Sequence, residues 1–88
     1  MSEQIRTDDL WEAALGVGRG LALVELEITH RPNGRHQRVI FVLAGDRARE
    51  MAHEYRAGRA EANVSVLKHS VTYLRKRLFA ALGEDVRR

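Results

Sequence analysis

The feature of this chain that most constrains its fold is a pair of β-forming segments on either side of Asn33-Gly34. Residues 21–29 and 38–44 are rich in branched and aromatic side chains, which favour strands. Asn-Gly is the preferred central pair of a type I′ turn, because both of its residues must adopt positive φ. The sequence therefore predicts an antiparallel β-hairpin that reverses at Asn33-Gly34.

A two-residue turn also fixes which residues of the two strands lie opposite each other. In that register the pairs alternate between an apolar face and a more polar face, which is the pattern of a half-buried sheet. The predicted pairs are Ile28 with Val39, Leu26 with Phe41, Val24 with Leu43, Glu25 with Val42, Glu27 with Ile40, Thr29 with Arg38 and His30 with Gln37. Because a two-stranded hairpin is rarely stable alone, we expect it to pack against helices.

The second strand is apolar on both faces from Val39 to Leu43. Such a strand needs cover on both of its sides. Either helices lie over both faces of the hairpin, or its open edges pair with those of a second copy, which predicts a homodimer through the hairpin. Both alternatives remain open from the sequence.

Three helices are predicted around the hairpin from apolar periodicity and capping residues. The first has Thr7 as its N-cap and ends in the segment Gly16-Val17-Gly18-Arg19-Gly20, because glycine supplies the left-handed exit from a helix. The second covers residues 47–57 after Asp46, and the third and longest covers residues 64–82 after Asn63. The predicted fold is α+β in the order helix, β-hairpin, helix, long helix (αββαα), as a single domain over 1–88 with 1–5 and 84–88 frayed.

Composition excludes several classes of protein. Hydrophobic residues make up 44% and charged residues 31% of the 88 residues, which is the balance of a globular domain. Cysteine is absent, so disulfides, thiolate zinc sites and cysteine nucleophiles are excluded. No apolar run approaches the roughly 20 residues that span a bilayer, and the N-terminal residues lack the apolar core of a signal peptide. We therefore expect a cytoplasmic location and no membrane partner.

Four short motifs follow one another along residues 5–80. They are Thr7-Asp8-x-Leu10 with Ala13-Ala14 and Gly16 after it, Arg38-Val39-x-Phe41-Val42, Glu54-Tyr55-x-x-Gly58 and Tyr73-Leu74-Arg75-x-Arg77-Leu78. In this order they resemble a small bacterial and phage family that is catalogued only as a domain of unknown function. The chain departs from that family in a longer hairpin and a methionine in the second helix. The resemblance implies the same order of elements and a phage or mobile-element setting, and it implies no catalytic residues.

The sequence offers no recognisable catalytic, cofactor or metal site. Gly16-x-Gly18-x-Gly20 has the spacing of a phosphate loop, but it follows a helix and precedes a strand, which is the reverse of the order such loops need. The four histidines are isolated and have no thiolate or carboxylate ligands nearby in the chain: His30, His36, His53 and His69. No nucleophile lies beside a base. We therefore predict that the protein is not an enzyme and holds no cofactor or metal.

Positive charge is concentrated in the second part of the chain. Residues 1–27 hold two arginines and six acids, whereas the remaining residues hold thirteen of the fifteen Lys and Arg. Basic side chains that neutralise phosphates give salt-dependent binding of nucleic acid. The candidate residues are Arg31, Arg35 and Arg38 in the hairpin and Lys68, Arg75, Lys76 and Arg77 on the third helix.

Two functions follow from these patterns. The first is a small binding or adaptor module that acts through protein contacts with an unknown partner, because the predicted hairpin leaves open edges and an apolar strand. The alternative is a basic nucleic-acid-binding protein that uses the hairpin and the third helix. Two features count against the alternative: acidic residues at Glu50, Glu54 and Glu61 interrupt the basic ones, and no exposed aromatic residue is predicted for base stacking.

Overall fold

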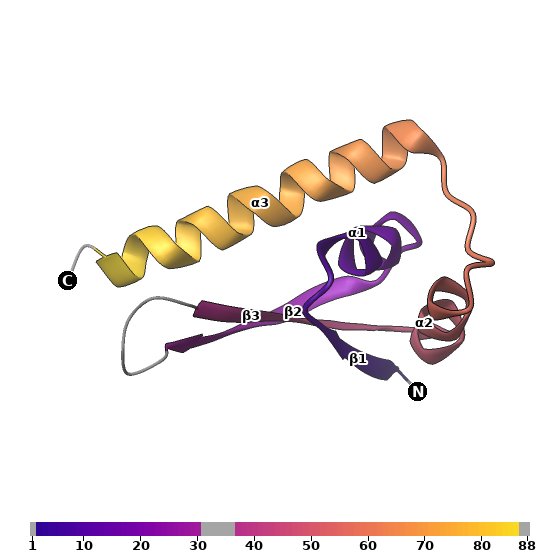
Figure 1. Cartoon of the computed structure of the whole chain (residues 1–88), viewed down its shortest axis with the longest axis horizontal. Helices are drawn as coiled ribbons and strands as arrows, with labels where there is room; N and C mark the ends of the chain where they lie inside the picture. The colour runs from indigo at the N-terminus through magenta and orange to yellow at the C-terminus, as the bar shows by residue number, and fades with distance from the viewer. Residues whose placement is uncertain (1, 31–36, 87–88) are drawn as a thin grey trace.

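The computed structural model describes residues 2–30 and 37–86 and shows an α+β fold (Figure 1). Its elements are β1 (Glu3–Thr7), α1 (Leu10–Gly18), β2 (Ala22–His30), β3 (Gln37–Gly45), α2 (Ala48–Arg56) and α3 (Val64–Val86). The three strands form one antiparallel sheet in the order β1-β3-β2. The predicted turn at Asn33-Gly34 lies outside the described residues, as do Arg31, Arg35 and His36.

Strand β1 was not predicted, and it lies where fraying was expected. Residues 3–7 pair antiparallel with β3, with Ile5 opposite Leu43 and Thr7 opposite Phe41. The strand was missed because its five residues, Glu-Gln-Ile-Arg-Thr, contain a single large apolar side chain. Its pairing makes β3 the central strand of the sheet, so neither edge of β3 is left open.

The predicted hairpin register is confirmed over most of its length. Five of the predicted cross-strand pairs are present from Glu25–Val42 to Thr29–Arg38, and His30 lies opposite Gln37. The pair of Val24 with Leu43 is wrong, because the register shifts between Leu23 and Glu25 and places Leu23 opposite Leu43. A bulge of this kind leaves one residue unpaired, and Val24 is accordingly 52% exposed.

Two predicted helix caps are also corrected. The N-cap of α1 is Asp9, whose carboxylate accepts hydrogen bonds from the backbone N–H groups of Trp11 and Glu12. Thr7 instead ends β1, and its Oγ1 accepts a hydrogen bond from the Asp9 N–H. Helix α2 begins after Arg47 rather than Asp46, and α3 extends past Gly83 to Val86, whereas α1 ends at Gly18, within the predicted glycine segment.

Asn63 is confirmed as a capping residue of α3. Its side-chain Oδ1 accepts a hydrogen bond from the Val66 N–H at 3.2 Å. This bond satisfies one of the amide groups that the first turn of a helix leaves without a partner.

The molecule is layered, with α1 between the sheet and α3 (Figure 1). The core contains Phe41 and Leu43 from β3, Ala13 and Ala14 from α1, and Leu74 from α3, all between 0% and 3% exposed. The second half of α3 extends past α1 (Figure 1). Its Arg77 and Ala80 line a small cavity together with Glu25 and Leu26 of β2. Because only one side of α3 contacts the rest of the fold, its other side is a surface of the molecule.

No helix in residues 2–30 and 37–86 is both long and apolar enough to cross a membrane.

Candidate functional site

The exposed side of α3 carries basic residues and, up to Gly83, no acidic ones. The helix is 23 residues long, and none of its residues from Val64 to Gly83 is acidic. Ser70, Val71 and Leu74 are buried, between 0% and 8% exposed, and they define the side that faces the fold. We call the opposite side the basic face of α3; its exposed residues are Lys68, His69, Thr72, Tyr73, Arg75, Lys76 and Phe79. Five of them line a shallow hollow: Lys68, His69, Thr72, Tyr73 and Lys76.

The structure brings together only some of the predicted nucleic-acid-binding residues. Lys68, Arg75 and Lys76 all lie on the basic face of α3. Arg77 lies on the flank that faces β2 and contributes to the small cavity there. Arg38 is on the sheet, where its guanidinium lies 3.6 Å from the Asp8 carboxylate.

Most arginines elsewhere in the fold already have an acidic partner. The ion pairs are Arg6–Glu27, Arg19–Glu54, Arg38–Asp8, Arg47–Glu50 and Arg56–Glu12. Within the described part of the chain, no ion pair involves Lys68, Arg75, Lys76 or Arg77. No ion pair among the described residues therefore neutralises Lys68, Arg75 or Lys76, whereas Arg77 shares its cavity with Glu25.

Aromatic side chains lie among these cations, so the prediction that exposed aromatics are lacking is wrong. Tyr73 is 42% exposed and Phe79 is 65% exposed. Residues three apart are neighbours on a helix surface, so Tyr73, Lys76 and Phe79 form one diagonal row. Phe79 is exposed although its apolar side chain would suit the buried side of α3, where Val71 and Leu74 lie.

A second basic hollow lies between β1 and α2. It is lined by Ile5, Arg6, Arg49, Ala52, His53 and Arg56 and by no acidic residue. Its charge is largely balanced all the same, because Arg6 pairs with Glu27 and Arg56 pairs with Glu12. This hollow therefore offers less free positive charge than α3 does.

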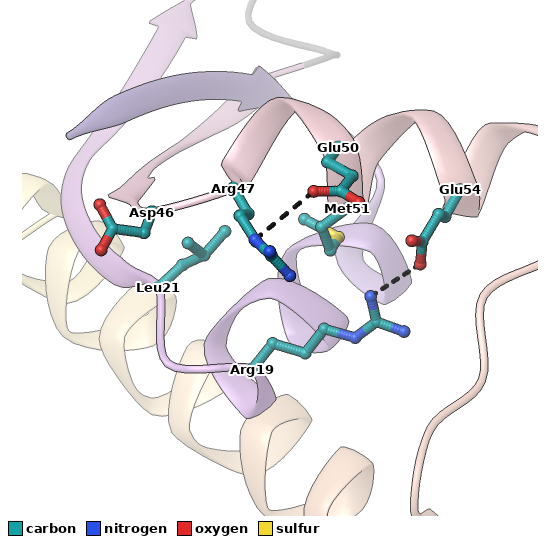
Figure 2. Close-up of a pocket in the computed structure, with 7 residues that line it drawn as sticks. All are labelled: Arg19, Leu21, Asp46, Arg47, Glu50, Met51 and Glu54. Carbon is teal, nitrogen blue, oxygen red and sulfur yellow. Dashed lines mark hydrogen bonds and ion pairs between the residues drawn. The ribbon is translucent and has the colours of Figure 1, made fainter. Parts of the chain in front are cut away.

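A cavity of about 210 Å³ at the start of α2 contains two pairs of opposite charges (Figure 2). Arg19 lies 3.0 Å from Glu54 and Arg47 lies 3.7 Å from Glu50. Leu21 and Met51 line the same cavity. Arg47 has a φ of 62°, in the left-handed region that is unusual for a residue with a side chain. Four of its charged side chains pair with one another, Asp46 has no ion pair among the described residues, and no serine, threonine, cysteine or histidine lines the cavity.

A buried polar network joins the start of α1 to the end of α2. Glu12 is 2% exposed, and the Arg56 guanidinium donates hydrogen bonds to its carboxylate at 3.1 and 3.4 Å. The Tyr55 hydroxyl donates a hydrogen bond to the Asp9 carboxylate at 2.8 Å. Burial, together with that hydrogen bond and the negative charges of Asp9 and Glu12, raises the pKa of Tyr55 from 10.0 to about 12. The network is structural, because its polar groups satisfy one another.

Tyr55→Phe is expected to remove a pH dependence of stability. The raised pKa means that Tyr55 stabilises the fold below about pH 10, and that this contribution is lost as the pH rises towards about 12. We expect the variant to be less stable by about 1 kcal/mol near neutral pH. Urea unfolding of both proteins at about pH 8 and about pH 11 measures the difference, which should shrink at the higher pH. An unchanged difference would contradict the proposed role of the hydroxyl.

No group of three or more His, Asp or Glu side chains in the described residues is arranged to hold a metal ion. Comparison with protein-family models, curated proteins and solved structures finds no match to this chain. The resemblance to a bacterial and phage family of unknown function therefore stays a prediction. The basic face of α3 combines cations that have no ion pair among the described residues with exposed aromatic rings.

Proposed function

We propose that the protein binds nucleic acid through the basic face of α3. The observation that carries this proposal is the contrast between α3 and the rest of the fold. Four cations of α3 have no acidic partner among the described residues, whereas five of the seven arginines described elsewhere, all except Arg49 and Arg59, pair with carboxylates. A face with unpaired cations and exposed aromatic rings has the two components by which proteins bind polynucleotides.

The geometry of the helix suits a repeating anionic ligand. An α-helix rises 1.5 Å per residue, so Lys68 and Arg75, seven positions apart, are separated by about 10 Å along the axis. Cations spread over that length contact several phosphates rather than one. Each phosphate that is neutralised releases counterions, which makes the affinity fall as salt rises.

The alternative is that the protein is an adaptor acting through protein contacts, including a homodimer through the hairpin. Its main motivations were the two-faced apolar strand and the open edges of the hairpin, and the pairing of β1 with β3 fills one of those edges within one chain. The outer strands of the sheet are now β1 and β2, and a bulge and two glutamates, Glu25 and Glu27, lie along β2. Bulges and charges on an edge strand oppose pairing with another sheet. The adaptor function therefore has less support than nucleic-acid binding.

A cytoplasmic location and a phage or mobile-element setting, both expected from the sequence, belong to the same proposal. Either would bring the protein into contact with nucleic acid.

Wild-type protein is expected to bind a fluorescein-labelled oligonucleotide with salt-sensitive affinity. The dissociation constant should be on the order of 10⁻⁶ to 10⁻⁴ M near physiological salt, and fluorescence anisotropy measures it. Lys68→Ala/Lys76→Ala removes two phosphate contacts, so the slope of log affinity against log salt should become shallower by about 1.5 to 2. Exposed helix positions tolerate alanine, which leaves the fold intact.

The matched control removes the same charge from another surface. Arg49→Ala/Arg59→Ala also deletes two exposed cations, and we expect it to keep the wild-type salt slope. If both double variants weaken binding equally, net charge rather than the α3 face is responsible. Absence of any binding at low salt would reject nucleic-acid binding altogether.

A further inference from the structure

We infer that the nucleic acid bound by α3 is single-stranded, with bases stacked on Tyr73 and Phe79 and the intervening backbone held by Lys76. This inference rests on the proposed function and specifies its ligand.

Cationic and aromatic groups alternate along the diagonal row. Tyr73, Lys76 and Phe79 follow one another at intervals of three residues, so a cation lies between two rings on a row that winds about 120° around the helix. Both rings are accessible, at 42% and 65% exposed. A single strand presents base faces and phosphates alternately, and the row presents a partner for each.

The faces of the bases are accessible to a protein in an unpaired strand but not in a duplex. In a duplex the faces of the bases are stacked on one another inside the helix, and proteins read their edges or the phosphates. Aromatic side chains contact base faces where the strand is unpaired. Lysine and arginine alone would be enough to bind a duplex backbone, so the two rings in the row are explained by an unpaired strand.

Tyr73 and Phe79 are six residues apart, which is about 9 Å along the helix axis and about 120° around it. Stacked bases of one strand rise about 3.4 Å per step. A strand that covers both rings must therefore splay its bases apart, which an unpaired strand does readily.

Further cations lie beside the diagonal row. Lys68 and Arg75 lie on the same stripe of the helix as Phe79, at positions i, i+7 and i+11. No acidic residue occurs between Val64 and Gly83 to repel a phosphate. The backbone on either side of a base on Phe79 therefore has cations within reach, in addition to Lys76.

The test separates the rings from the cations. Tyr73→Leu/Phe79→Leu keeps apolar side chains and a residue type that favours helices, but it removes both stacking surfaces. We expect its affinity for 20-nucleotide single-stranded DNA and RNA to fall by about ten- to a hundredfold, with the salt slope retained. Affinity for the corresponding duplex should change less than threefold. The matched control is Trp11→Leu, which removes a ring of comparable exposure, 52%, from α1, and it should bind as the wild type does.

A spectroscopic measurement tests the contact directly. In a protein carrying Trp11→Phe and Phe79→Trp, the single tryptophan lies in the row, and a stacked base should quench its fluorescence. The duplex should quench it little. Circular dichroism of each variant checks that helix content is retained.

The outcomes distinguish the two proposals. Unchanged single-strand affinity in Tyr73→Leu/Phe79→Leu, or tighter binding of duplex than of single strand, overturns the inference about strandedness. If Lys68→Ala/Lys76→Ala still flattens the salt slope in that case, the proposed nucleic-acid binding stands. Absence of binding to both forms at low salt removes both.

Discussion

Leu43→Ala is expected to lower the free energy of unfolding by about 2–5 kcal/mol, the usual cost of deleting a buried leucine side chain. Leu43 is 0% exposed and lies in the central strand, opposite Ile5 of β1 and Leu23 of β2. It also packs against α1, where a Cβ added at Gly16 would lie 2.8 Å from its Cδ1. Because small domains have only about 5–15 kcal/mol of stability in total, the variant is expected to be partly unfolded at moderate urea concentrations.

Val24→Ala is the matched control for Leu43→Ala. In a regular hairpin register Val24 would lie opposite Leu43 and share its burial, whereas the bulge leaves it 52% exposed. We therefore expect a change of at most about 0.5 kcal/mol, as is usual for surface substitutions. Urea unfolding followed by circular dichroism measures both variants. If Val24→Ala costs as much as Leu43→Ala, the bulge is misplaced and the regular register is correct.

Arg56→Ala is expected to destabilise the fold by about 2 kcal/mol, because it leaves the Glu12 carboxylate without its ion-pair partner. Glu12 is 2% exposed, so water cannot replace the lost hydrogen bonds fully. The Arg56 side chain is 64% exposed. This exposure screens the pair and keeps the expected cost below the roughly 3–5 kcal/mol of a fully buried pair.

A double-mutant cycle identifies the source of that cost. Glu12→Gln/Arg56→Ala carries no buried charge, so it should recover part of the stability lost in Arg56→Ala. Glu50→Gln breaks a pair whose side chains are 85% and 59% exposed, and we expect it to change stability by less than about 0.5 kcal/mol. No recovery in the double variant would mean that Arg56 acts through packing of its aliphatic part rather than through Glu12.

The hairpin register was predictable because it depends on local pattern. Alternation of apolar residues every second position and a suitable turn together leave one register for residues 25–29 and 38–42. The departure at Val24 was not predictable in the same way. A bulge inserts one residue without breaking the apolar character of the strand, and the segment from Leu21 to Val24 is apolar throughout, so either register places an apolar residue opposite Leu43.

The candidate site shows the same division. Lys68, Arg75 and Lys76 were identified from the sequence, because helical spacing alone puts them on the side opposite the buried stripe. The exposed rings of Tyr73 and Phe79 were not identified. Their exposure became clear only when the fold showed which side of α3 packs on the rest of the molecule, namely that of Ser70, Val71 and Leu74.

By itself the sequence determined the hairpin, the three helices and the α+β class, because each depends on periodicity, turns and caps within a few neighbouring residues. The tertiary structure alone decided that residues 3–7 form a strand beside β3, since that pairing joins segments almost forty residues apart. It also decided which cations are free: an arginine is neutralised only when folding brings a carboxylate within reach, as it does for Arg56 with Glu12 and for Arg6 with Glu27. Local pattern sets what a segment can become, and contacts between distant segments set which of its groups remain available to a ligand.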